Sequence, residues 1–122
     1  MAKRGFLPCF SAYDHNHFPV EKLYDLDSNV RRAKALVSAF IDSESPSAIK
    51  NQIGGKDIKP IRPDSQEGKR LIQHFSFPYE IFRVDYGRTP LRIIFGLSKA
   101  DRMAYILAFD VSHSTFSGKH RK

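Results

Sequence analysis

The chain has 122 residues, 41% of them hydrophobic and 27% charged, and a formal net charge of +7. Its length predicts one domain spanning residues 1–122, and no apolar run reaches the roughly 18–20 residues that cross a bilayer. The excess positive charge favours a polyanionic partner: nucleic acid, an acidic protein or an anionic membrane surface. The alternative is a basic protein whose charge serves no specific partner. Cys9 is the only cysteine, so no intramolecular disulfide can form, which favours a reducing, cytoplasmic location.

The N-terminal part of the chain combines an aromatic run with a loop. The run Gly5–Tyr13 has side chains typical of a strand, but Pro8 restricts such a strand to a sheet edge. The letters His-Asn-His at 15–17 lack the spacing of the nuclease motif of that name. His15 and His17 could share a metal only from one face of a strand, and no other His or Cys spacing accompanies them. We therefore expect no metal site and no cofactor.

The clearest helix is predicted over Val30–Asp42, where apolar residues recur at helical spacing. Asp27 or Ser28 can cap its first turn. The opposite face is basic, and the usual place for such a face is in solvent. Pro46 then ends the helix region, because proline disfavours helical geometry in the residue before it.

The middle of the chain is rich in loop-forming residues. Ser47–Gly55 predicts a second, short helix that ends on a glycine cap. Lys56–Asp64 predicts a connector interrupted by prolines, unsuited to a central strand. Asp64–Phe75 predicts one or two helical turns, weakened by Gly68. His74, on an apolar segment, is expected to be a partly buried structural histidine.

From residue 79 the hydrophobic pattern changes to period two. Three runs, Tyr79–Tyr86, Pro90–Ser98 and Met103–Ser112, are joined by links short enough for hairpins, which predicts an antiparallel meander. The last run is apolar on both its odd-numbered and even-numbered residues, which predicts a central strand covered on both faces. The predicted fold class is α+β. An antiparallel sheet, made of this meander and a possible N-terminal strand, would pack against one to three helices.

The last third of the chain, Ile81–Phe116, resembles the RelE/ParE/HigB superfamily of bacterial type II toxins. In that family one strand carries a basic residue, the next begins with arginine before apolar residues, and the last ends in His or Arg with an aromatic residue close behind. The matching positions here are Arg83, Arg92, His113 and Phe116. The family opens with a strand leading directly into a helical hairpin, whereas here an aromatic N-terminal stretch and a proline-rich middle replace a clean hairpin.

The resemblance implies a small endoribonuclease that cleaves mRNA, in many members on the ribosome, without a metal or cofactor. An acidic antitoxin protein would neutralise it, and no membrane partner is expected. Such cleavage needs a base, an acid and cations that stabilise the phosphate. His113 can transfer the proton, and Arg92 and Arg83 can hold the phosphate. The alternatives are a histidine that merely ends a strand and an Arg92 that pairs with Asp85 across the sheet.

The C-terminal tail is predicted to contact RNA. Phe116 offers a ring for base stacking, although it equally suits packing, and it lacks the hydroxyl that a tyrosine would bring. Lys119, Arg121 and Lys122 can contact phosphates, or form a frayed terminus. Two other functions remain open for the whole chain: a non-catalytic RNA- or ribosome-binding module, and a toxin that poisons DNA gyrase.

Overall fold

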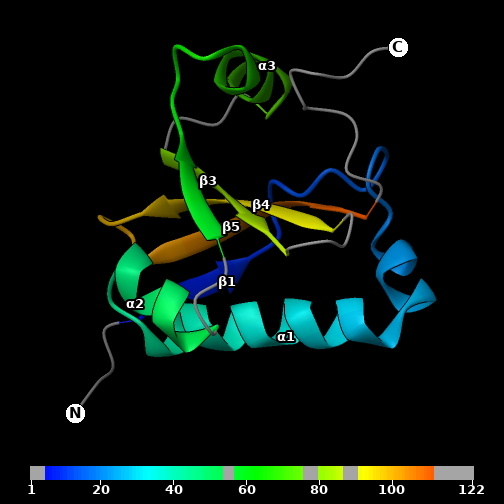
Figure 1. The fold of residues 1–122 in the computed structure, drawn as a ribbon. Coiled ribbons are helices and arrows are strands. Elements are labelled where there is room, and N and C mark those ends of the chain that lie inside the picture. The colour runs from blue at the N-terminus through cyan, green and yellow to red at the C-terminus, as the bar shows by residue number, and fades with distance from the viewer. Residues whose placement is uncertain (1–4, 54–56, 76–79, 87–90, 112–122) are drawn as a thin grey trace.

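The computed structural model describes residues 5–53, 57–75, 80–86 and 91–111. Its elements in chain order are β1 (Leu7–Cys9), the 3-10 helix η1 (Val20–Asp25), α1 (Asp27–Asp42), α2 (Pro46–Gln52), β2 (Asp57–Ile61), α3 (Gln66–Phe75), β3 (Glu80–Asp85), β4 (Arg92–Ser98) and β5 (Met103–Asp110). They form one small domain around a five-stranded sheet (Figure 1), and the predicted α+β class is confirmed. Among the described residues, no helix combines the length and hydrophobicity needed to cross a membrane.

The sheet has the strand order β1-β5-β4-β3-β2. The predicted antiparallel meander of β3, β4 and β5 is confirmed. β1 joins it parallel to β5, so the sheet is mixed and not purely antiparallel as predicted. The segment predicted to be a connector instead contains β2, which pairs antiparallel with β3. Pro8 in β1 and Pro60 in β2 both lie in edge strands, where the missing N–H of proline is tolerated.

A register shift in β5 changes which of its side chains share a face. Ile106 lies opposite Phe95, whereas Ala108 lies opposite Ile94. Residues opposite one another project from the same face, and the consecutive Ile94 and Phe95 project from different ones, so Ile106 and Ala108 also lie on different faces. The predicted division of this strand into odd-numbered and even-numbered faces is therefore wrong beyond Ile106. An extra residue, Leu107, produces the shift.

α1 covers one face of the sheet. Phe40 is fully buried, and its ring lies 4.8 Å from that of Phe95, centroid to centroid. The helix begins at Asp27 with Leu26 as its N-cap, and no side chain caps it, so the predicted cap by Asp27 or Ser28 is wrong. α2 follows directly, and the Ser45 side chain caps it by accepting a hydrogen bond from the backbone N–H of Ala48.

α3 lies on the other side of the sheet, above α1 in the view of Figure 1. Its Leu71 is fully buried, although the helix contains a glycine. Gly68 lies against the backbone of Arg62, so close that an added Cβ would come within 1.9 Å of the Arg62 carbonyl oxygen. The glycine that weakens the helix locally is thus required by packing. Glu67 of α3 pairs with Arg83 of β3, so α3 lies over the sheet face that carries polar side chains.

Candidate functional site

Arg83 and Arg92 are brought together on the face of the sheet opposite α1. Asp85 lies directly across from Arg92 in the register of β3 and β4, and two residues along β3 from Arg83. All three side chains therefore project from one face. Asp110 lies opposite Arg92 on β5, and Glu67 reaches Arg83 from α3. These five residues are called the charged cluster below.

Contacts within the charged cluster hold α3 to the sheet. Arg83 Nη1 donates to both carboxylate oxygens of Glu67, at 2.7 and 2.8 Å. Asp85 Oδ1 lies 3.1 Å from Arg83 Nε and 3.4 Å from Arg92 Nε. These are ion-pair distances, yet within the described residues neither Nε nor this oxygen forms a hydrogen bond. One carboxylate oxygen is thus shared between two guanidinium groups, and donor capacity remains.

The surroundings of Arg92 disfavour its charge. Burial lowers the pKa of Arg92 first, and the nearby Arg83 guanidinium lowers it further, while Asp85, Glu67 and Asp110 oppose the change. Among the described residues, three carboxylates face two guanidinium groups, so the cluster has no excess positive charge as folded. A phosphate would bind best if it replaced one of these carboxylates. Glu67 is the carboxylate most readily replaced, because it lies on α3, whereas Asp85 and Asp110 are fixed on strands of the sheet.

The structure bears differently on each predicted site residue. It joins Arg83 and Arg92, and the predicted alternative of an Arg92–Asp85 pair is present as an ion pair. His113 and the RNA-binding residues Phe116, Lys119, Arg121 and Lys122 lie outside the described residues.

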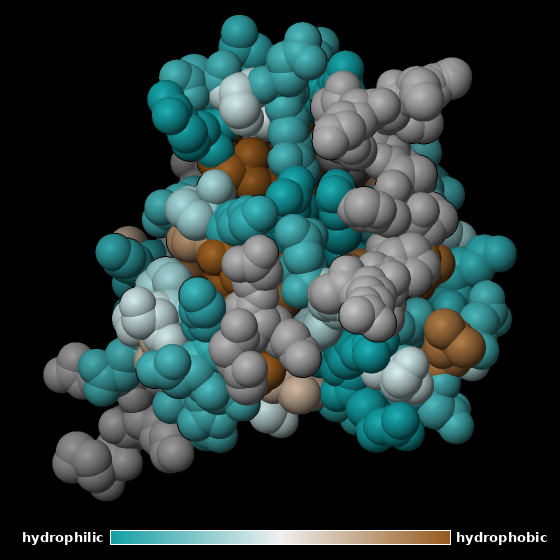
Figure 2. All heavy atoms as spheres, in the orientation of Figure 1, coloured by the Kyte–Doolittle hydropathy of each residue, from teal (hydrophilic) through white to brown (hydrophobic). Residues whose placement is uncertain are grey.

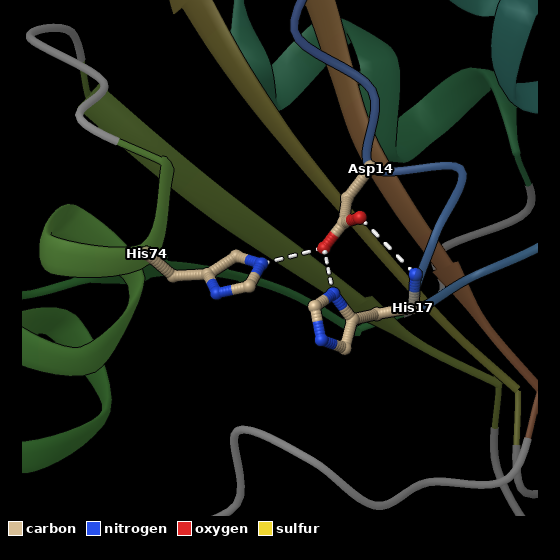
Figure 3. Close-up of side chains that lie close together, drawn as sticks. All are labelled: Asp14, His17 and His74. Carbon is tan, nitrogen blue, oxygen red and sulfur yellow. Dashed lines mark hydrogen bonds and ion pairs between the residues drawn. The ribbon is translucent and has the colours of Figure 1, made fainter.

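A second cluster was not predicted from the sequence. Asp14 Oδ2 lies 2.9 Å from His17 Nδ1 and 2.5 Å from His74 Nε2 (Figure 3). Asp14 and His17 belong to the loop after β1, whereas His74 lies in the last turn of α3, 60 positions after Asp14. We call these residues the histidine cluster. The sequence carries no signal for this cluster, because His17 and His74 lie far apart in the chain and no spacing links them.

Tyr13 fixes the loop that carries the histidine cluster. Its hydroxyl donates to the Phe18 carbonyl oxygen at 2.6 Å and accepts from the Phe109 N–H at 3.2 Å. Burial raises the pKa of Tyr13 to about 12. The neighbouring backbone N–H of Asp14 donates to the Leu107 carbonyl oxygen of β5 at 3.2 Å. Asp14 therefore starts from a position set by the central part of the sheet.

Asp14 is held in its charged form. Partial burial acts to raise its pKa, but hydrogen bonds from His74 and from the backbone and ring of His17 outweigh burial, and the pKa falls below its ordinary 3.8. The carboxylate is therefore ionised at neutral pH and accepts from both imidazole rings. Side-chain exposure is 12% for Asp14 and 61% for His17. The cluster thus has a fixed carboxylate and an outward-facing ring.

An apolar groove lies between η1 and α1, away from both clusters' side chains. It encloses about 410 Å³ and is lined by Phe10, Val20, Leu23, Tyr24, Val30, Ala33, Lys34, Val37, Ser38 and Phe109. Tyr24 and Phe10 are exposed large side chains on its wall. The face of the molecule in Figure 2 is, by contrast, largely hydrophilic with small hydrophobic patches.

Comparison with known proteins finds no matching family model, no similar curated protein and no similar solved structure.

Proposed function

We propose that the chain is a toxin-like endoribonuclease that cleaves mRNA through metal-free acid–base chemistry. The observation that carries the proposal is the pair of guanidinium groups, Arg83 and Arg92, that share the Asp85 carboxylate on one sheet face. The chain shares with the RelE-like pattern a first strand, two helices and a final meander, and departs from it by η1 before the helices and by β2 and α3 between the helices and the meander.

The reaction is attack of the RNA 2′-hydroxyl on the adjacent phosphate. A base takes the hydroxyl proton, the new P–O bond forms, and the 5′-oxygen leaves with a proton from an acid, giving a 2′,3′-cyclic phosphate and a 5′-hydroxyl. His113 serves in proton transfer. Arg83 and Arg92 stabilise charge on the phosphate, and the phosphate takes the place of Glu67 at Arg83.

An acidic antitoxin is the proposed protein partner. Its support is the net charge of +7 together with the apolar groove, whose lining includes Lys34. Arg31, one helical turn earlier on α1, is exposed on the same side. An amphipathic acidic segment suits this combination, because its apolar face can fill the groove while its carboxylates meet the two cations.

Induced expression in bacteria tests the proposal, with primer extension on abundant mRNAs after growth slows. We expect arrest and new cleavage sites for the wild type, and loss of both for Arg92→Ala and His113→Ala. Removing a transition-state contact of this kind typically lowers the rate about 100- to 1,000-fold. Arg31→Ala is the matched control, because it removes one positive charge at an exposed position on α1, and it should still cleave.

Three other outcomes would contradict the proposal. Arrest without mRNA cleavage would favour a gyrase poison. Cleavage that survives in His113→Ala and Arg92→Ala would place the chemistry elsewhere. If growth continues although circular dichroism of the purified chain shows that it is folded, the non-catalytic binding module is favoured.

A further inference from the structure

We propose that Asp14, His17 and His74 form a binding site for a divalent transition-metal ion of the zinc type, joining the loop after β1 to α3. The inference is independent of the proposed ribonuclease. Each residue offers one ligand atom, and the three atoms all lie within 4.8 Å of one another. Two imidazole nitrogens and one carboxylate oxygen are a donor set that binds zinc and related ions in proteins.

The three donor atoms can hold an ion after a rearrangement of their side chains. Zinc bonds of about 2.0–2.1 Å in tetrahedral geometry place ligand atoms about 3.3 Å apart. In the structure the Asp14 oxygen lies 2.9 Å from His17 Nδ1 and 2.5 Å from His74 Nε2. Each of these two pairs therefore separates by less than about 1 Å, whereas the two imidazole nitrogens, which lie within 4.8 Å of one another, close in on the ion. His17, whose side chain is 61% exposed, has room for that movement.

Outer contacts orient the carboxylate for this role. Asp14 Oδ1 accepts a hydrogen bond from the backbone N–H of His17 at 3.1 Å, which leaves Oδ2 facing both rings, as Figure 3 shows. Tyr13 fixes the adjoining backbone on β5. Such second contacts commonly raise metal affinity, because they reduce the rearrangement that binding requires.

Three protein ligands leave a tetrahedral ion with an open position. Sites of this composition bind water or a small ligand there. The ion would also fasten the last turn of α3, which carries His74, while Glu67 holds the first turn to Arg83. Metal binding would therefore fix α3 over the charged cluster at both of its ends.

The test uses the full chain after chelator treatment, with Co²⁺ as a spectroscopic probe and Zn²⁺ in calorimetric titration. We expect a single Co²⁺ per chain with the visible absorption of a four-coordinate site, displaced by Zn²⁺. His17→Ala, His74→Ala and Asp14→Asn should each weaken binding at least about tenfold. His15→Ala is the matched control, because His15 lies in the same loop with its ring against Tyr13, and its affinity should stay at the wild-type value.

A second measurement does not depend on variants that fold. In the wild type, Co²⁺ should broaden or shift the NMR signals of the Asp14–His17 loop and of the last turn of α3 together. Wild-type protein that binds no Co²⁺ would overturn the proposal, leaving Asp14 as a hydrogen-bond bridge between two histidines. So would paramagnetic effects confined to other residues, or affinity lost in His15→Ala and kept in the three cluster variants.

Discussion

Among the described residues, two buried tyrosines are expected to lower stability at alkaline pH when they ionise. Burial raises the pKa of Tyr13 and of Tyr86 to about 12, from an ordinary value of 10.0. Their exposed fractions are 8% and 6%. Above pH 10 the unfolded chain loses these protons while the folded chain keeps them, so folding stability is complete below pH 10 and falls as the pH rises toward 12.

We expect each tyrosine to contribute about 2–3 kcal/mol to that fall. Urea denaturation between pH 8 and 12 measures it. Tyr86→Phe should remove about half of the decrease, and Tyr13→Phe a similar share. Below pH 10, Tyr13→Phe should also cost about 1–3 kcal/mol, because the Phe109 N–H and the Phe18 carbonyl lose a buried partner. A flat profile between pH 10 and 12 in the wild type would contradict this account.

Gly68 shows at the level of an element why packing outweighs local propensity. Gly68→Ala would normally favour a helix by about 1 kcal/mol. Here the new methyl group meets the Arg62 carbonyl oxygen at 1.9 Å, and the Ser65 side chain, which accepts from the Gly68 N–H at 3.0 Å, fixes that turn. We expect a net loss of about 1–3 kcal/mol in the free energy of unfolding.

Chemical denaturation with circular dichroism measures the effect of Gly68→Ala. Gln73→Ala is the matched control in the same helix, because Gln73 is exposed, and it should change stability by less than about 0.5 kcal/mol. Gly68→Ala as stable as the wild type would show that α3 can move away from the Arg62 backbone without cost.

How far the sequence predicts an element depends on how local its causes are. The meander follows from period-two runs joined by short links, and the same register brings Asp85 opposite Arg92. β2 was missed because its proline is acceptable only at an edge, which depends on the completed sheet. The register shift at Leu107 leaves no mark on the alternation of apolar residues. Neighbouring strands are predictable, whereas edges and bulges require the assembled fold.

The same limit applies to the two clusters. Arg83 and Arg92 lie on adjacent strands, so a resemblance in the strand pattern was enough to select them. The histidine cluster needs the loop after β1 placed against β5 and α3 placed over the sheet. Leu7 pairs with Met103 near the other end of the chain, and no local pattern contains that pairing. Long-range contacts of this kind determine which histidines meet.

At the scale of the whole molecule, the proposed ribonuclease would meet RNA chiefly through its net charge. A net charge of +7 attracts any polyanion, and the charged cluster contributes little, because its guanidinium groups face carboxylates. Affinity for single-stranded RNA should therefore depend steeply on salt. With about four phosphate contacts, the expected loss is about 50-fold between 50 and 200 mM salt.

Fluorescence anisotropy with a labelled RNA that lacks 2′-hydroxyl groups at the cleavable positions measures this affinity without cleavage. Arg92→Ala should leave the salt dependence almost unchanged while abolishing cleavage of ordinary RNA, because its guanidinium acts on the reacting phosphate within a compensated cluster. The salt dependence is the slope of log affinity against log salt concentration. If Arg92→Ala lowers this slope by the amount expected for one phosphate contact, Arg92 binds RNA before the reaction begins. An RNA affinity that does not change with salt concentration would contradict the electrostatic account. The slope thus distinguishes the net charge of the chain, which binds RNA, from the Arg92 guanidinium, which stabilises the reacting phosphate.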